Sequence, residues 1–390
     1  MKTYNDALKY LDWLCVFGIK EGLERIKELA AALDNPQNFY RTIHVAGTNG
    51  KGSVCAMLAE ILKVHGLKVG LFTSPHLESY CERIKINDEN ISEEDFAEMI
   101  FRVKDCNVVA THFEVLTAAA FLYFKIRAVD VAVIEVGLGG TFDSTNIITP
   151  ELSIITNVAL DHENILGDLK NIALNKAGII KEKIPIVTGA TGEPLEIIRA
   201  VAKEKNSSLY EVNPHQLKSD SYQLNLRGEY QKFNAAIAIK AAQILGVNDE
   251  KIFSALSKVE WAGRFEVVEN FVIDGAHNPH GATALRESLD KNFPHGKRIW
   301  LFGVLKDKNF NDMIKILFRP NDFVIVTKVP SERAAEPEMI CEILHERGIE
   351  CVAVENNFAA VERFKNSDGD VKILAGSLYL IGAVRKFLVA

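Results

Sequence analysis

Short apolar runs typical of β-strands alternate with longer segments of helical periodicity along almost the whole chain. This alternation is the strongest constraint on the fold, because parallel strands need a crossover connection and a helix usually supplies it. The expected strands are residues 42–46, 68–72, 129–136, 152–157 and 184–187 in the first part, and 271–273, 298–302, 323–327, 351–354 and 372–375 in the second. The sequence therefore predicts an α/β protein built on parallel sheets.

The length of 390 residues favours two domains. A polar, irregular stretch over residues 206–227 precedes an alanine-rich helical pattern over 228–245, and a fresh α/β series follows it. We therefore expect the boundary at residues 262–264, which separates domains of residues 1–262 and 263–390. Two such domains are expected to face each other across a cleft, which is the usual place for a substrate to bind.

The clearest functional motif is Val45-Ala46-Gly47-Thr48-Asn49-Gly50-Lys51-Gly52-Ser53, which lies between an expected strand and an expected helix. Its glycines let backbone N–H groups close around phosphate oxygens, and the positive end of the following helix favours an anion. Lys51 would supply a point charge, and Ser53 would supply a hydroxyl for a magnesium ion. The spacing is shorter than that of the common nucleotide-binding loop, so a glycine-rich turn is the alternative interpretation.

Two further expected strands end near polar groups. Glu135 ends an apolar run and precedes three glycines, whereas Asp161 and His162 follow the expected strand 152–157 after a short spacer. Open α/β sheets bind ligands at the carboxyl ends of their strands, which favours Glu135 as a magnesium ligand or a water-orienting group. The alternatives are a structural ion pair at Glu135 and a surface histidine at His162, because magnesium prefers oxygen to imidazole nitrogen.

The second part of the chain carries the string Asp274-Gly275-Ala276-His277-Asn278-Pro279 after an expected strand. Asp274 can accept hydrogen bonds from ribose hydroxyls, and His277 can donate one to a phosphate oxygen. Arg264, at the expected domain boundary, has the guanidinium geometry that suits phosphate. A helix is expected to begin at Pro279, so helix capping is the alternative explanation of this string.

Composition excludes several classes of protein. The 45 lysines and arginines against 52 aspartates and glutamates give a formal charge of −7, which argues against a nucleic-acid-binding surface. No stretch approaches the roughly 18 apolar residues of a membrane span, and no secretory signal is apparent. Six scattered cysteines without a C-x-x-C pair are typical of reduced thiols. We expect a cytoplasmic protein with no nucleic-acid or membrane partner.

Taken together, these strings resemble the folylpolyglutamate synthase and dihydrofolate synthase family, a branch of the Mur ligase superfamily. The strings that carry the resemblance are Gly47 to Ser53, Thr73-Ser74-Pro75-His76-Leu77, Glu82-Arg83-Ile84, Phe113-Glu114, Glu135 to Asn146, Ala159-Leu160-Asp161-His162, Lys176 to Ile179, Gly228 to Asn234, Gly263-Arg264-Phe265, Asp274 to Pro279 and Gly376-Ser377. The resemblance implies an N-terminal P-loop ATPase domain with a mostly parallel sheet, a smaller C-terminal Rossmann-like α/β domain, and ATP held between them.

The resemblance also implies roles for individual residues. By matching position, Ser53, Glu135 and His162 are expected to be magnesium ligands. Lys176, which as a helix lysine would usually be solvated, falls where the family carries a carbamylated lysine that helps to organise a second magnesium ion. The expected ATP-binding residues are Gly47, Thr48, Asn49, Gly50, Lys51, Gly52, Ser53, Asn234, Arg264, Asp274 and His277, the expected catalytic residues are Lys51, His162 and Lys176, and the expected folate-binding residues are Ser74, Pro75, His76, Leu77 and Arg83.

The implied reaction is the ATP-dependent ligation of L-glutamate to a folate carboxylate through an acyl phosphate. The acceptor would be a reduced folate, and we expect dihydropteroate to be accepted as well. The alternatives are a member with one of the two activities, a peptidoglycan-precursor Mur ligase and a non-catalytic nucleotide switch. The uridine-nucleotide domain of a peptidoglycan-precursor Mur ligase has little room before Gly47. A nucleotide switch would not need Asp274 and His277. We expect a monomer whose partners are these small molecules.

Overall fold

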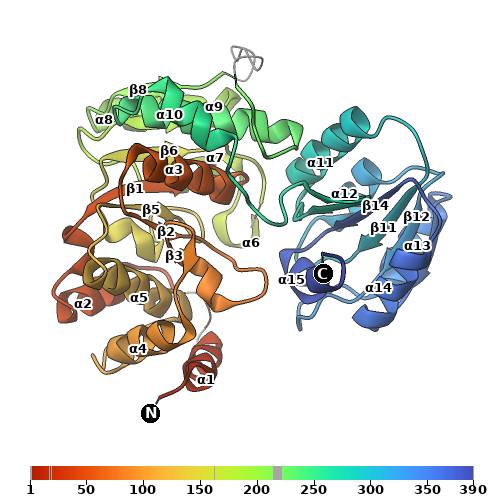
Figure 1. Ribbon diagram of the computed structural model, residues 1–390, viewed down its shortest axis with the longest axis horizontal. Helices are drawn as coiled ribbons and strands as arrows, with labels where there is room; N and C mark the ends of the chain where they lie inside the picture. Colours follow the sequence, from red (N-terminus) through yellow and green to blue (C-terminus); the bar gives the residue numbers. More distant parts are fainter. Residues whose placement is uncertain (1, 17, 19, 162, 214–221, 390) are drawn as a thin grey trace. The chain divides into compact units, whose positions relative to one another are not determined.

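The protein is described by a computed structural model over residues 2–16, 18, 20–161, 163–213 and 222–389. The chain forms two compact units, whose helices and strands are labelled in Figure 1. Unit 1 comprises Met1–Leu224 and Phe233–Val259, and unit 2 comprises Asn225–Lys232 and Glu260–Ala390. Each unit has a sheet of mainly parallel strands with helices packed on it, which confirms the predicted α/β class.

In the described part of unit 1, eight strands form one sheet in the order β4-β3-β2-β5-β1-β6-β7-β8. The strands are β1 (Arg41–Ala46), β2 (Val69–Phe72), β3 (Ile84–Ile86), β4 (Glu89–Asn90), β5 (Val131–Glu135), β6 (Leu152–Ile155), β7 (Ile186–Thr188) and β8 (Leu209–Glu211). β3 runs antiparallel to β2 and β4, and the other pairs are parallel. Since β5 and β6 flank β1, the carboxyl ends of these three strands are neighbours.

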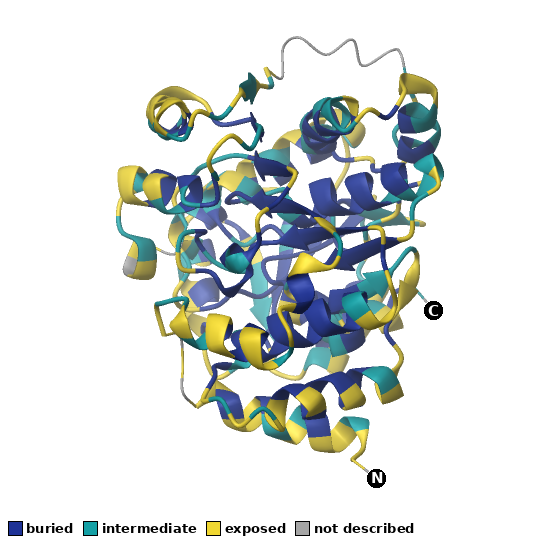
Figure 2. Cartoon of the chain, turned by 90° about the vertical axis from the view of Figure 1, so that its left-hand side faces the viewer, coloured by how far each residue is buried: buried dark blue, intermediate teal, exposed yellow. Residues whose placement is uncertain are grey.

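Helices pack on this sheet and on one another and bury apolar side chains. They are α1 (Tyr4–Cys15), α2 (Glu24–Ala32), α3 (Lys51–His65), α4 (Glu93–Lys104), α5 (His112–Ile126), α6 (Glu163–Leu166), α7 (Leu169–Ala177), α8 (Gly192–Glu204), α9 (Glu229–Ile244), whose first residues belong to unit 2, and α10 (Asp249–Leu256). Residues of α1, α2, α4 and α5 share a core with Phe72, Ala132 and Ile134, and α3 packs on β1, β2 and β5. Figure 2 shows the central strands as buried and the outer helix faces as exposed.

In the described part of unit 2, six strands form one sheet in the order β13-β12-β11-β14-β10-β9, in which β9 alone is antiparallel to its neighbour. The strands are β9 (Glu266–Val268), β10 (Phe271–Asp274), β11 (Arg298–Phe302), β12 (Phe323–Val326), β13 (Glu350–Ala353) and β14 (Val371–Ala375), and the helices are α11 (Pro279–Asn292), α12 (Phe310–Leu317), α13 (Pro337–Glu346), α14 (Asn357–Asn366) and α15 (Leu378–Val384). α11, α12 and α13 share one core with the sheet. No described helix of either unit is both long and apolar enough to cross a membrane.

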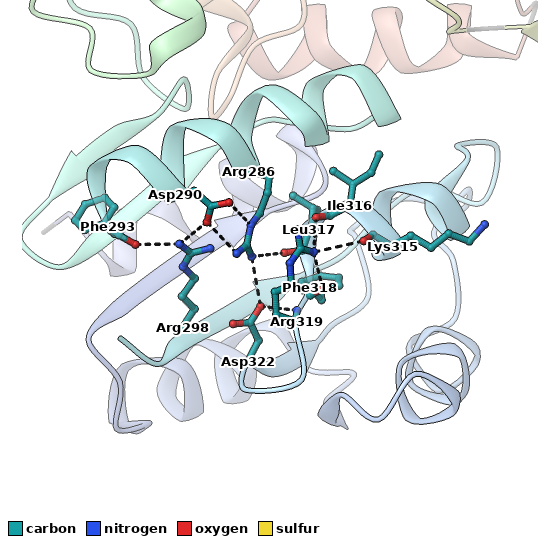
Figure 3. Close-up of polar contacts among 10 residues, drawn as sticks. All are labelled: Arg286, Asp290, Phe293, Arg298, Lys315, Ile316, Leu317, Phe318, Arg319 and Asp322. Atoms are coloured by element: carbon teal, nitrogen blue, oxygen red, sulfur yellow. Dashed lines mark hydrogen bonds and ion pairs between the residues drawn. The ribbon is translucent and has the colours of Figure 1, made fainter. Parts of the chain in front are cut away.

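A network of charged side chains connects α11, β11 and the end of α12 in unit 2 (Figure 3). Arg298, whose side chain is 6% exposed, donates from Nη2 to Oδ1 of Asp290 at 2.8 Å and to the carbonyl of Phe293 at 2.9 Å. Arg286 also binds Asp290 at 2.8 Å and donates to the carbonyl of Leu317 at 2.9 Å. The network therefore satisfies backbone carbonyls at the ends of both helices while it neutralises a buried guanidinium.

Replacing Asp290 by alanine should lower the free energy of unfolding of unit 2 by about 2 kcal/mol, because Arg298 then stays buried without its carboxylate. The loss is smaller than for a fully buried pair, since half of the Asp290 side chain is exposed. The control Asp312→Ala removes an exposed carboxylate that pairs with Lys315 and should have little effect. Hydrogen exchange of the β11 amides, measured at increasing urea concentrations, gives the free energy of unfolding of both variants. Equal losses of this free energy in the two variants would contradict the prediction.

Candidate active site

The loop between β1 and α3 requires glycine at two positions. Gly47 and Gly50 have φ angles of +147° and +83°, which side chains rarely adopt. A Cβ at Gly47 would lie 1.9 Å from Oγ1 of Thr156, and a Cβ at Gly50 would lie 2.4 Å from Oδ1 of Asn234. The chain after β6 and the helix α9 therefore approach the loop so closely that a larger residue would displace them.

Hydrogen bonds tie the same loop to the segment that follows β6. Thr48 donates from Oγ1 to the carbonyl of Ala159 at 3.1 Å and accepts from the N–H of Ala159 at 3.0 Å. The N–H of Asn49 donates to Oδ1 of Asn157 at 3.0 Å, and the carbonyl of Asn49 accepts from Nδ2 of Asn157 at 2.8 Å. The loop is thus held before any ligand binds. His162, three positions after Ala159, lies outside the described residues.

Two lysines donate to one carbonyl oxygen of this loop. Nζ of Lys51 lies 3.1 Å from the oxygen of Gly47, and Nζ of the buried Lys176, on α7, lies 2.9 Å from it. Burial and the charge of Lys51 lower the pKa of Lys176 to about 7, although Asp161 and Asp143 act in the opposite direction. A large part of the Lys176 population is therefore a neutral amine at neutral pH.

Glu135 ends β5 directly beside β1 and is 4% exposed. Its Oε2 accepts from the N–H of Ser74 at 2.9 Å. Burial raises the pKa of the Cys55 thiol, and the charge of Glu135 raises it further, so the carboxylate lies close to the first turns of α3. The buried hydroxyl of Ser53 belongs to the same turns. This stretch of the sheet edge therefore presents the two kinds of oxygen that magnesium prefers.

No three histidine, cysteine, aspartate or glutamate side chains converge on a metal position among the residues that the structure describes. A magnesium ion at this edge would therefore take the oxygens of Ser53 and Glu135 and complete its shell with oxygens from water or substrate, as magnesium usually does. The donor chemistry of the two residues fits the ion.

Asp143 is a buried residue of this region that the sequence does not single out. Its Oδ2 accepts from the N–H of Leu138 at 2.9 Å and its Oδ1 accepts from the N–H of Thr145 at 3.0 Å. Burial raises the pKa of Asp143, while these hydrogen bonds lower it. The carboxylate thus holds the glycine-rich loop after β5 in place. A carboxylate a few residues after the glycines that follow β5 is the signal that could have identified it.

The predicted folate segment follows β2 as one continuous loop. The carboxylate of Glu82 accepts hydrogen bonds from the N–H groups of Leu77, Glu78 and Ser79 at 2.8, 2.8 and 2.7 Å. Arg83, which is 7% exposed, donates from Nε to Nδ1 of His76 at 2.8 Å. The loop is therefore folded around one carboxylate and presents His76 and Arg83 side by side.

In unit 2, Asp274 ends β10 and is buried. Its Oδ2 accepts from the hydroxyl of Tyr230 at 2.6 Å and from the N–H of Phe265 at 2.9 Å, and its Oδ1 accepts from the N–H of Ala276 at 2.8 Å. Burial raises the pKa of Asp274, whereas the Tyr230 hydrogen bond and the charge of Arg264 lower it. Tyr230 is the residue that sequence reasoning missed here, because it lies 44 positions away from its partner.

The other predicted residues of unit 2 surround the same strand end. Nη1 of Arg264 would lie 2.1 Å from a Cβ at Gly275, so the guanidinium packs directly on this glycine. Nδ1 of His277 lies 2.9 Å from the carbonyl of Gly275, and because a carbonyl only accepts, Nδ1 carries the proton. Asn278 caps α11, which begins at Pro279 as predicted.

The described site residues therefore form two groups, one within each unit. The first contains the loop residues Gly47, Thr48, Asn49, Gly50, Lys51, Gly52 and Ser53 with Glu135, Lys176, Asn234 and the folate segment, and the second contains Arg264, Asp274 and His277. Each group lies at the carboxyl ends of parallel strands, where open α/β sheets bind their ligands.

Two family models match the chain. Residues 45–206 match the Mur ligase middle domain, and residues 263–378 match the glutamate ligase domain of Mur ligases. A dihydrofolate synthase/folylpolyglutamate synthase of Bacillus subtilis is 35% identical over 427 aligned positions, which cover 99% of both chains.

Solved structures agree with these matches. Escherichia coli FolC in complex with DHPP and ADP is 28% identical with a TM-score of 0.89, covering 98% of this chain and 97% of that one. The bifunctional folylpolyglutamate synthase/dihydrofolate synthase of Yersinia pestis, complexed with AMPPNP and Mn ion, is 30% identical with a TM-score of 0.88, covering 99% and 98%. With this similarity along its full length, the chain belongs to the folylpolyglutamate synthase and dihydrofolate synthase family of Mur ligases.

Proposed function

We propose that this chain is an ATP-dependent ligase that joins L-glutamate to the carboxylate of a folate, and that it also acts on dihydropteroate. The observation that carries the proposal is the preformed phosphate loop in a chain that matches a dihydrofolate synthase/folylpolyglutamate synthase over its full length. Relatives from Escherichia coli and Yersinia pestis bind ADP and AMPPNP, which supports ATP as the nucleotide.

The reaction runs through an acyl phosphate. The N–H groups of the loop and of the first turn of α3 bind the phosphates, and Lys51 spreads the charge of the transferring phosphoryl group. A substrate carboxylate oxygen attacks the γ-phosphorus and ADP leaves. The neutral amine of glutamate then attacks the acyl carbon and loses a proton, and phosphate leaves as hydrogen phosphate, so that an amide remains. The side chains act by binding and orientation, and no protein nucleophile is needed.

Ser53 and Glu135 are the residues that would hold magnesium, together with His162 by family resemblance. When bound, the ion would neutralise charge on the phosphate oxygens. We also propose that Lys176 is carbamylated and that its carbamate helps to hold a second magnesium ion. The buried, partly neutral amine supports this modification, because only the neutral amine adds carbon dioxide and the product is an anion of carboxylate character.

In unit 2, Asp274 and His277 are proposed to contact the nucleotide. A carboxylate offers about four acceptor positions, and three protein donors reach Asp274, which leaves capacity for a ribose hydroxyl. Nδ1 of His277 donates to the carbonyl of Gly275, so Nε2 would donate to a phosphate oxygen only in an imidazolium that carries protons on both ring nitrogens. Arg264 and Asn234 are proposed as further ATP contacts.

The functional division into residues 1–262 and 263–390, a monomeric state and a cytoplasmic location stay predictions.

Removing a magnesium ligand should slow turnover with the fold intact. We expect Ser53→Ala and Glu135→Gln each to lower kcat by about 100-fold, because the phosphoryl charge is then stabilised less well. Ser153→Ala is the matched control, since it removes a buried hydroxyl on β6 that donates to the carbonyl of Ile179 at 3.0 Å. Steady-state rates with circular dichroism spectra test this, and wild-type kcat in both variants would remove these residues from the site.

Carbamylation of Lys176 should give a carbamate carbon signal in ¹³C NMR spectra of protein equilibrated with ¹³C-bicarbonate. The amine adds carbon dioxide and releases one proton, so at a fixed concentration of dissolved carbon dioxide the signal should grow as pH rises through about 7, the pKa of Lys176. Lys176→Ala should lack the signal, and small carboxylates should restore part of its activity. The control Lys181→Ala should keep the signal. A fully active Lys176→Ala protein without rescue would reject the modification.

Both acceptor chemistries should be visible in product masses. With ATP and glutamate, tetrahydrofolate should gain glutamate residues and dihydropteroate should become dihydrofolate. If no dihydrofolate forms under conditions in which tetrahydrofolate gains glutamate residues, the protein has only the folylpolyglutamate synthase activity. ADP formation that does not depend on any amino acid would instead favour the nucleotide switch.

A further inference from the structure

Tyr80 and His112 lie beside the two polar residues of the folate segment. We name His76, Tyr80, Arg83 and His112 the Arg83 cluster. Tyr80 and Arg83 are the ends of a 3-10 turn (Tyr80–Arg83), His76 precedes this turn, and His112 is the first residue of α5. Since α5 contributes its inner face to the core of unit 1, His112 connects the loop to a rigid part of the fold.

The hydrogen bond between Arg83 and His76 determines where the charge of the cluster lies. Because the N–H of Arg83 can only donate, Nδ1 of His76 accepts and the ring proton is on Nε2. Burial, the charge of Arg83 and His112 lower the pKa of His76 to about 3, in agreement with a neutral ring. The positive charge of this pair therefore resides on the guanidinium.

Tyr80 contacts both partners of that hydrogen bond. Its ring centroid lies 4.3 Å from that of His76 and 5.3 Å from the guanidinium carbon of Arg83, within the range of a cation–π contact. The Tyr80 hydroxyl is 3.0 Å from Nε2 of His112, and burial followed by the charge of Arg83 lowers the pKa of His112 to about 4. One end of the Tyr80 side chain is thus fixed by α5 while its face supports the cation.

We propose that Tyr80 and His112 are positioning residues that hold the guanidinium of Arg83, through His76, in the orientation that receives a carboxylate of the folate substrate. This inference rests on the proposed function, in which Arg83 belongs to the folate segment. A guanidinium binds a carboxylate best when two N–H groups along one of its edges point at the two carboxylate oxygens. A side chain already ordered by its neighbours loses less conformational entropy on binding, and this gain appears as affinity.

The test compares variants that remove the hydrogen bond between Tyr80 and His112 with variants that keep it. Tyr80→Phe and His112→Leu remove the hydroxyl–imidazole hydrogen bond, whereas His112→Gln retains a polar atom near the position of Nε2. We expect the KM for reduced folate to rise about tenfold in the first two, with kcat and the KM for ATP unchanged, and to stay within about threefold in His112→Gln. The control Tyr40→Phe removes another buried hydroxyl, which donates to the carbonyl of Phe121 at 3.2 Å, and should leave all three constants unchanged.

Two results would overturn the inference. One is a wild-type KM for folate in Tyr80→Phe and His112→Leu. The other is a change for the worse in kcat, in both KM values and in thermal stability that occurs alike in Tyr80→Phe, His112→Leu and the control Tyr40→Phe. Such a result would indicate that the residues have a structural role only.

An inactive wild-type protein would reject the proposed function instead. In that case the ¹⁵N NMR spectrum of His76 still tests whether Tyr80 orders the hydrogen-bonded pair of Arg83 and His76. We expect the Nε2–H tautomer in the wild type and a mixture of tautomers in Tyr80→Phe, and an unchanged tautomer in that variant would contradict the inference.

Discussion

The carbonyl oxygen of Gly47 is the point on which the phosphate loop depends. Lys51, which is partly exposed, and the buried Lys176 both donate to it, so their two amines lie no more than about 6 Å apart. Their mutual repulsion and the loss of water make one of them give up its proton readily, and this is Lys176, the more deeply buried of the two. Thr156 in turn occupies the space that a side chain at Gly47 would need. Loop geometry and amine chemistry therefore have one structural origin.

The strands of the sheet centres could be predicted because strands buried on both faces are continuous apolar runs. The predicted run 298–302 is β11, and the predicted runs 42–46 and 372–375 differ from β1 and β14 by one residue. The strands β3, β4, β8 and β9 were not predicted. They are two or three residues long, lie at or near sheet edges and are largely half-buried or exposed, so neither apolar content nor alternation marks them.

The strand-to-helix loop from Gly47 to Ser53 and the position of Glu135 at a strand end could be predicted because their signals are local, in a glycine spacing and in a charge at the end of an apolar run. The supporting residues could not. Tyr230 reaches Asp274 across 44 positions and Tyr80 reaches His112 across 32, so only the folded chain brings these pairs together. Single tyrosines and histidines carry no signal in a sequence until their neighbours are known.

The carboxylate of Glu82 has a consequence for selectivity. Three successive backbone N–H groups, those of Leu77, Glu78 and Ser79, converge on it. Such a concave array would otherwise be an anion nest that attracts inorganic phosphate or the tail of a nucleotide. By filling the nest with an internal anion, the chain leaves these three N–H groups no capacity for a dissolved oxyanion.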